Sequence, residues 1–538
     1  MRSKNFFRFL SGSFSGLCVG LLLSSSNLLA QDSAIDPNAF GYYRDALRFS
    51  QQGLMGSARM QSVGGASTAL GGDITSAYTN PAGLGLLTKS EVSFAPSLAF
   101  LGSRTEFQGE ETNTFRPNLN FAHLELAIHV PSSRSDSFYK GGAFALNFTR
   151  LNTFHNRFSY EGANNQNSLI DYLLESSSRF TWGDLDNEIT SNITSIEGLA
   201  YATYLINPDF IEDNGSETSY YSFVPVSPIR QLETVDTRGA QNNWNLSYGG
   251  SFGDVFFIGG GVAMQTFSYT QSRTYIEQVT GGAIDNPSAP RMLNELTLEE
   301  NMGLNGVGVN ASLGLIIRPL PLLRIGASFH SPTIMSIKET FDARLDVNYN
   351  NVEFEENGEV RVLGNESAET AIVESRYSLT TPWRANVGAA IFFGKRGFIS
   401  ADAEYVALNN ANFTNRKDNL SFGADNRTIE NLYHPVVNYR IGAEARFENY
   451  YLRGGAAYFA DPFNPDTREG ADQSLKRDRL IFTGGVGYRD EEIYFDLGGS
   501  FGRSQFLYNP YTLANNAQPT ATVNSGMFNL VASIGLHF

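Results

Sequence analysis

The sequence predicts an all-β protein, a fourteen-stranded antiparallel transmembrane β-barrel with an N-terminal hatch segment in its lumen. Three observations lead to this prediction. Apolar and polar residues alternate with a period of two along much of the chain, and short and long connections alternate between the predicted strands. After residue 30 the chain contains no run of ~20 apolar residues, the length that a membrane-spanning helix requires.

The composition differs from that of average soluble domains and argues against nucleic-acid binding. Aromatic residues make up 13% of the 538 residues and charged residues only 17%, whereas average soluble domains carry ~25% charged residues. The 39 basic and 55 acidic residues give a net charge of -16, so the chain offers no basic stripe for a phosphate backbone. We therefore expect no nucleic-acid partner.

Residues 1–30 have the pattern of a cleaved signal peptide. Three basic residues lie near the start, an apolar stretch runs over residues 14–23, and small residues lead to Ala30. The only cysteine, Cys18, lies in the apolar stretch, so the mature chain is expected to hold no disulfide and no thiolate metal site. The protein is therefore expected to be exported.

Residues 91–538 are predicted to form the barrel. In residues 437–447 apolar residues at odd positions alternate with polar, charged or small residues at even positions, and the last strand alternates in the same way. Strands of ~9 to 11 residues suffice to cross a bilayer, with one face toward lipid and the other toward the lumen. We expect strands at residues 91–102, 117–130, 139–153, 242–252, 255–270, 305–317, 321–348, 368–394, 396–408, 436–448, 450–460, 478–489, 491–503 and 525–538.

The connections between these strands predict the orientation of the barrel. Tight turns alternate with long connections at residues 154–241, 271–304, 349–367, 409–435, 461–477 and 504–524. Outer-membrane barrels show this parity because their periplasmic turns are short and their outward loops are long. We therefore expect an outer membrane of a Gram-negative bacterium, with both termini in the periplasm.

The longest connection, residues 154–241, is predicted to hold a short amphipathic helix at residues 168–175 and a second apolar segment at residues 199–206. Three roles are open for this insert. It forms an apolar groove that captures a ligand, a lid that packs over the barrel mouth, or a docking surface for a protein partner.

Two predicted strands, residues 321–348 and 368–394, are longer than a bilayer requires, and each contains a proline. Pro332 and Pro382 are expected at similar heights in the wall because the two strands pair. Proline cannot donate a ladder hydrogen bond. One interpretation is a kink at the outer rim, and the other is a weakened seam through which a ligand leaves sideways.

Residues 31–90 do not alternate and are rich in small residues. Residues 42–52 are expected to form one or two helical turns, and a glycine-rich stretch follows at residues 64–73. A barrel of fourteen strands encloses more space than its own side chains fill. We therefore expect this segment to plug the lumen.

The glycine-rich stretch and the motif Asn80, Pro81, Ala82 and Gly83 resemble the N-terminal hatch of the FadL/TodX outer-membrane proteins. The resemblance implies a channel or carrier for hydrophobic small molecules such as long-chain fatty acids. In that family the ligand passes from an outer groove to a lumen pocket and then sideways past the hatch. Similar barrels also serve as non-transporting scaffolds of larger outer-membrane assemblies, and this is the alternative function. The expected partners are outer-membrane lipid, the ligand and, through the long loops, other proteins.

Several arginines are predicted to point into the lumen by alternation, namely Arg384, Arg440, Arg446 and Arg453. Two roles are open for them: structural ion pairs with inward carboxylates and the hatch, or recognition of a ligand carboxylate. None of the six histidines has a serine or carboxylate motif beside it. We therefore expect no catalytic residue, no metal site and no cofactor.

Overall fold

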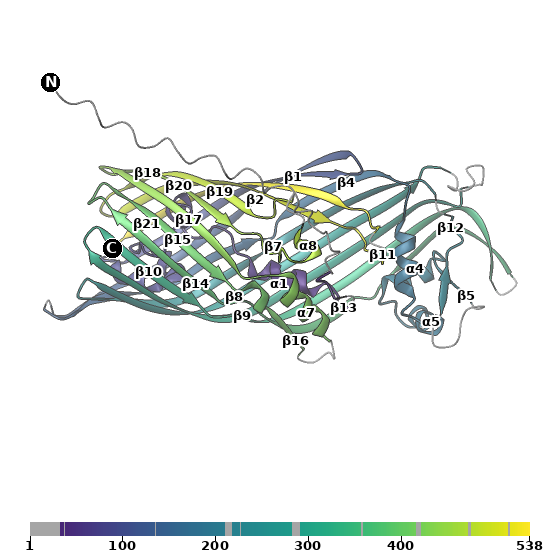
Figure 1. Cartoon of the computed structure of the whole chain (residues 1–538), viewed down its shortest axis with the longest axis horizontal. Helices are drawn as coiled ribbons and strands as arrows, with labels where there is room; N and C mark the ends of the chain where they lie inside the picture. The colour runs from purple at the N-terminus through teal and green to yellow at the C-terminus, as the bar shows by residue number, and fades with distance from the viewer. Residues whose placement is uncertain are drawn as a thin grey trace, which may run out of the picture.

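The structure is a computed structural model that describes residues 33–538 except 37, 135, 210–217, 226, 282–290, 357–358, 416–420, 472–474 and 515–516. The predicted signal peptide, residues 1–30 with Cys18, lies outside the described residues. The described chain forms a long barrel with a small helical unit at one end (Figure 1).

The wall is a closed antiparallel barrel of 14 strands, as predicted. It closes because the last strand pairs with the first, from Glu91 opposite His537 to Glu106 opposite Thr522. Closure pairs the backbone groups that an open sheet would leave at its edges. Each predicted strand lies within or largely overlaps one strand of the wall.

Some wall strands consist of two or three consecutive segments. In chain order the wall contains β1 (Glu91–Phe107), β2 (Glu110–Pro131), β3 (Tyr139–Thr153) continued by β4 (Asn156–Asn164), β7 (Ile229–Phe252), β8 (Phe256–Val279), β9 (Leu293–Leu320), β10 (Leu323–His330) continued by β11 (Ile334–Glu356), β12 (Glu359–Glu369) continued by β13 (Val373–Thr380) and β14 (Arg384–Phe392), β15 (Gly397–Val406) continued by β16 (Asn412–Asn415), β17 (Val436–Phe447), β18 (Tyr450–Phe459), β19 (Arg479–Arg489), β20 (Ile493–Tyr508) and β21 (Ala521–His537).

The two ends of the barrel differ. We call the end with the tight turns and the C-terminus the short-turn end, and the opposite end, where β12 and the helical unit lie, the long-loop end (Figure 1). The predicted long connections at residues 271–304 and 349–367 are mostly strand, because β8 and β9 continue outward as a pair and β11 and β12 form a hairpin. Strands outside a bilayer need no apolar outer face, so the lipid-facing pattern does not reveal them.

A belt of exposed apolar side chains surrounds the wall. On β17, Tyr439 and Ile441 are 56% and 55% exposed, whereas the inward Asn438 and Glu444 are 6% and 8% exposed. The same alternation continues around the barrel and confirms the predicted polarity, with apolar residues outside and polar residues inside. A barrel surrounded by lipid requires this arrangement.

The insert between β4 and β7 forms the helical unit at the long-loop end (Figure 1). It contains α4 (Leu169–Ser177), α5 (Trp182–Thr190), α6 (Ile196–Ala202) and the short strands β5 (Asn207–Asp209) and β6 (Ser219–Tyr221). The predicted helix at residues 168–175 is confirmed as α4, which begins with a capping box. Within the described residues, no helix is both long and apolar enough to cross a bilayer.

Residues 42–87, which we call the lumen segment, lie inside the barrel. They form α1 (Tyr42–Ser50), α2 (Ala58–Ser62), α3 (Ser76–Thr79) and the 3-10 helix η1 (Pro81–Leu86). The predicted turns at residues 42–52 are confirmed as α1. The segment approaches the wall so closely that a Cβ atom at Gly442 would overlap the carbonyl oxygen of Val63, and one at Gly249 would overlap that of Pro81. Glycines on opposite sides of the wall therefore seat the segment.

Candidate functional site

Three adjacent wall strands are interrupted at similar height. The gaps are residues 331–333 between β10 and β11, residues 381–383 between β13 and β14, and residues 407–411 between β15 and β16. The first two gaps face each other, because β10 pairs with β14 and β11 pairs with β13. We call these three gaps together the wall interruption.

Pro332 and Pro382 occupy the two facing gaps, at the similar height that the sequence predicted. Irregular hydrogen bonds replace the ladder here. The Thr333 amide donates to Thr381 Oγ1 at 3.0 Å, and the Thr381 amide donates to the Thr333 carbonyl at 3.0 Å. The two strands therefore remain joined at this point, although not by a regular ladder.

Trp383 covers the wall interruption on the lipid-facing side. Its ring centroid lies 5.9 Å from that of Phe329 and 5.1 Å from that of Tyr405. Phe329 and Tyr405 are 42% and 37% exposed and belong to the apolar belt. An aromatic cluster therefore separates the lipid from the interior at this place.

Two cavities lie in the lumen behind the wall interruption. The first contains about 390 Å³ of empty space and the second about 340 Å³, and in both this figure includes space open to solvent. Gln52 of the lumen segment and Arg384 of β14 line both cavities. Pro382 lines the second cavity, which therefore reaches the wall interruption itself.

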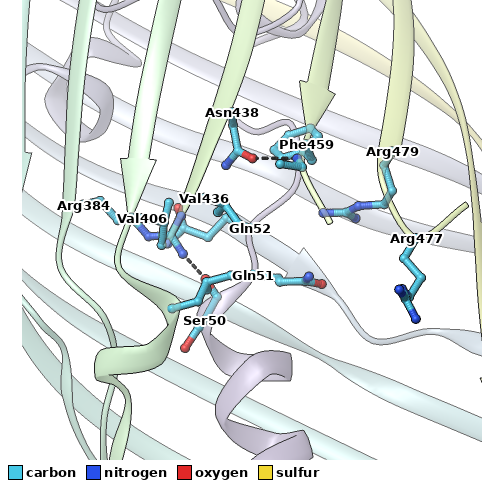
Figure 2. A pocket seen from close by; sticks show the side chains of 12 residues that line it. Ser50, Gln51, Gln52, Arg384, Val406, Val436, Asn438, Phe459, Arg477 and Arg479 are labelled. Carbon is cyan, nitrogen blue, oxygen red and sulfur yellow. Dashed lines mark hydrogen bonds between the residues drawn. The ribbon is translucent and has the colours of Figure 1, made fainter. Parts of the chain in front are cut away.

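The first cavity combines an apolar lining with three arginines (Figure 2). Its apolar part includes Val406, Leu408, Val436 and Phe459, and its cationic part consists of Arg384, Arg477 and Arg479. Arg384 and Arg479 enter from opposite sides, with Gln52 between them (Figure 2). This lining suits a molecule that has both an apolar body and an anionic end.

Arg384 holds the lumen segment against the wall. Its Nη1 lies 3.4 Å from Glu404 Oε1, and its Nη2 donates to the carbonyl of Ser50, the last residue of α1. The guanidinium therefore connects the end of α1 to β14 and β15, directly beside the wall interruption.

Arg479 differs from the other two arginines of the first cavity. In the described part of the chain no carboxylate lies within ion-pair distance of Arg479, and its guanidinium carbon is 4.9 Å from the ring centroid of Phe459. Arg477 pairs with Asp461 at 2.8 Å. The guanidinium of Arg479 is therefore available to pair with an anionic group of a ligand in the cavity.

Sequence reasoning missed Arg477 and Arg479 as site residues. The inward positions of β19 are odd-numbered, and Ile481 is buried. Extending that alternation to the first residue of β19 identifies Arg479 as inward. Arg477 lies in a connection where no periodicity applies, so no sequence signal marks it.

Arg440 and Arg453, predicted to face the lumen, take part in buried ion pairs. Arg440 contacts Glu404 at 2.7 Å. Arg453 contacts Glu444 at 2.7 Å and Asp496 at 2.6 Å, and the Arg453 side chain is fully buried. Glu444 also contacts Arg59 of the lumen segment at 2.9 Å. The Arg59–Glu444 pair fastens the lumen segment to the wall, and the other pairs join strands of the wall to one another.

Arg446 does not join this group. It is exposed at the end of β17, where its Nε donates to the carbonyl of Glu448 at 2.7 Å. The strand ends at Phe447, so the alternation that predicts an inward side chain ends there too.

The hatch motif, residues 80–83, lines neither of the two cavities. Asn80 Nδ2 donates to the carbonyl of Thr68 at 2.6 Å, and Asn80 Oδ1 accepts from the Ala82 amide at 3.2 Å. Pro81 begins η1, and a Cβ atom on Gly83 would meet the Cα of Gly71 at 2.9 Å. The motif therefore folds the lumen segment back on itself.

No family model matches the sequence, and no curated protein matches it. Solved structures do match. They include a FadL homologue of Pseudomonas aeruginosa, at 12% identity over 90% of this chain and 98% of that chain, with a TM-score of 0.49. The chain is similar to a FadL homologue and to toluene transporters. The latter are TodX of Pseudomonas putida (12% identity, 91% and 100% of the two chains, TM-score 0.47) and TbuX of Ralstonia pickettii (15%, 90% and 99%, 0.46). These structures include a FadL homologue and TodX, the proteins whose hatch the N-terminal residues resemble.

Proposed function

We propose that the protein is an outer-membrane channel or carrier for hydrophobic small molecules. The observation that carries the proposal is the first cavity, which lies in the lumen directly behind the wall interruption and combines apolar side chains with Arg479. The apolar belt suits a closed barrel in a bilayer. The tight turns and the C-terminus would then face the periplasm.

The first cavity suits an amphipathic ligand such as a long-chain fatty acid. Val406, Leu408 and Val436 offer an apolar surface for the tail, and Arg479 offers a guanidinium for the carboxylate.

The proposed route ends with lateral exit through the wall interruption. The ligand enters from the long-loop end, binds in the first cavity and leaves between the two facing gaps, past Trp383. Three observations support this route: the prolines in both gaps, the irregular hydrogen bonds between them, and the second cavity that reaches Pro382.

The lumen segment would act as the hatch. Residues 31–90 were expected to plug the barrel, and the contacts of residues 42–87 support that role. Arg384 holds the carbonyl of Ser50 and contacts Glu404, and both partners compete with an incoming carboxylate. A ligand carboxylate that moved from Arg479 to Arg384 would therefore weaken the attachment of α1 and favour movement of the hatch.

Ligand binding by the purified full chain tests this function. The probe is a fluorescent 16-carbon fatty acid, compared with its methyl ester, in neutral detergent. We expect Arg479→Leu to weaken binding of the acid about tenfold or more, because a charge-assisted bond is lost, and to leave the ester unchanged. Arg503→Leu, which removes an exposed arginine of β20, is the matched control. Equal binding of the acid by the wild type and Arg479→Leu would refute a carboxylate site.

A second candidate is a scaffold role without transport. The observation that favours it is the apolar cluster at the long-loop end, where Leu199 and Leu205 of the insert and Leu345 of β11 are each 0% exposed. This packing attaches the insert to β11. Gentle purification separates the two functions: stoichiometric protein partners with an empty lumen favour a scaffold, whereas lipid retained in the cavities favours transport.

A further inference from the structure

β12 has an edge without a strand partner at the long-loop end. β12 pairs with β11 on one side. On the other side β16 would be the neighbour, but β16 pairs only with residues 377–380 of β13. Within the described residues, the 11 residues of β12 therefore have a ladder on one side only.

The hydrogen bonds of the hairpin show which residues of β12 face the unpaired side. The Thr370 amide donates to the carbonyl of Ala343 in β11 at 2.8 Å. Because backbone groups alternate in direction along an antiparallel strand, Asn365, Ser367 and Glu369 direct their amides away from β11. The next amide that points away from β11 is that of Ala371. It donates to the carbonyl of Ile193 at 2.8 Å, so the row of unpaired amides ends at Glu369.

Apolar side chains beside this edge are exposed although they lie outside the belt. Val360, Val362 and Ile372 are 67%, 57% and 68% exposed, whereas Leu363 on the inner face is 0% exposed and anchors the strand. The exposed ion pair between Lys338 and Glu374 lies between this region and the belt. Lipid therefore does not account for the exposure of these residues.

We propose that the edge of β12 binds an extended polypeptide segment of a partner protein by strand addition. A row of alternating amides and carbonyls at strand spacing matches the backbone of an extended chain, and exposed side chains on alternate positions add selectivity. Valine or threonine fits beside Val360 and Val362, and lysine fits beside Glu369, whose side chain is 77% exposed although it lies 3.9 Å from Arg344.

Symmetry excludes antiparallel pairing of this edge with that of a second copy in the same membrane. Two identical strands that pair in antiparallel fashion are related by a two-fold axis perpendicular to their sheet. The β11–β12 hairpin continues the barrel wall, so the normal to its sheet lies near the membrane plane (Figure 1). Such an axis would invert one barrel relative to the other. The partner is therefore a different protein.

A synthetic peptide of about eight residues that alternates valine with lysine or threonine tests the proposal. Its binding to the purified full chain in neutral nanodiscs is followed by fluorescence anisotropy. The variant Ser367→Pro removes one outward amide without removing a bond to β11, and Ser367→Ala at the same position is the matched control. A peptide with every second amide methylated tests the same bonds without altering the protein.

We expect the wild type and Ser367→Ala to bind the peptide with similar affinity. Ser367→Pro should reduce affinity about tenfold, the effect of losing roughly one hydrogen bond, and the methylated peptide, which loses several donors, should bind more weakly still. Undetectable binding to the wild type overturns the proposal. Equal binding of the plain and methylated peptides overturns it as well, even if Ser367→Pro fails to fold. Neither outcome bears on fatty-acid binding in the first cavity, so the two proposals fail independently.

Discussion

His330 and Arg384 form the last residue pair of the β10–β14 ladder before both strands are interrupted. Each holds the lumen segment: His330 Nε2 donates to the carbonyl of Thr79 at 3.4 Å, and Arg384 donates to that of Ser50. The lumen segment is therefore attached to both strands directly below the wall interruption. Movement of the segment and opening of the wall are mechanically connected at this pair.

A crosslink across the wall interruption is expected to block lateral exit. In a Cys18→Ser background, Thr333→Cys with Thr381→Cys joins the two facing gaps, whose residues already share hydrogen bonds. We expect uptake of the fluorescent fatty acid into proteoliposomes to fall about tenfold on oxidation and to recover on reduction. Ala327→Cys with Val387→Cys crosslinks the regular ladder of the same strands and is the control. Full uptake with the gaps crosslinked would show that ligand leaves elsewhere.

Enlarging Gly442 is expected to displace the lumen segment. A Cβ atom at Gly442 overlaps the Val63 carbonyl, so Gly442→Val pushes α2 from its seat, whereas Gly454 has only a distant neighbour, Thr483 O at 3.9 Å. Gly442→Val should raise single-channel conductance in planar bilayers, because a displaced plug opens the lumen. Gly454→Val should leave conductance at the wild-type level. Unchanged conductance in both variants would mean that the segment tolerates the added methyl groups in place.

Removing Arg453 is expected to destabilise the barrel. Arg453→Leu leaves Glu444 and Asp496 buried with one cationic partner fewer each, although Arg59 and Arg489 still contact them. We expect a loss of about 3 kcal/mol in the free energy of unfolding, the lower end for a broken buried pair. Arg104→Leu, which breaks an exposed pair with Glu111, should have a much smaller effect because solvent screens that pair. The temperature at which gel mobility changes from the folded to the unfolded form compares the variants.

The insert is expected to loosen when Glu277 is changed. The Glu277 carboxylate accepts from Ser168 Oγ at 2.6 Å and from the Leu169 amide at 2.8 Å, which attaches the start of α4 to β8. Glu277→Gln weakens these charge-assisted bonds and should cost about 1 to 3 kcal/mol locally. Hydrogen exchange of residues 168–177 should accelerate. Glu299→Gln, at an exposed position of β9, should not change it, and slow exchange in Glu277→Gln would show that apolar packing alone holds α4.

The sequence by itself was sufficient to predict the barrel, because the alternation of apolar and polar residues that marks a barrel strand is local to each strand. Lipid outside and a polar interior require period-two alternation within each strand, as β17 shows with exposed Ile441 and buried Asn438. The same pattern located Arg440 and Arg453 on the inner face. It also placed Pro332 and Pro382 opposite each other, since both positions follow from strand ends and pairing.

Only the tertiary structure decided which inward charges are paired. Glu444 contacts Arg453 from the neighbouring strand and Arg59 from the lumen segment, more than 380 positions away in the chain. Among the residues that the structure describes, no carboxylate lies within ion-pair distance of Arg479. Register between strands and the position of an irregular segment depend on contacts between distant residues, which a local periodicity does not encode. The sequence also did not predict that four strands extend beyond the bilayer, namely β8, β9, β11 and β12. The outer faces of these extensions meet water, so they carry no lipid-facing pattern.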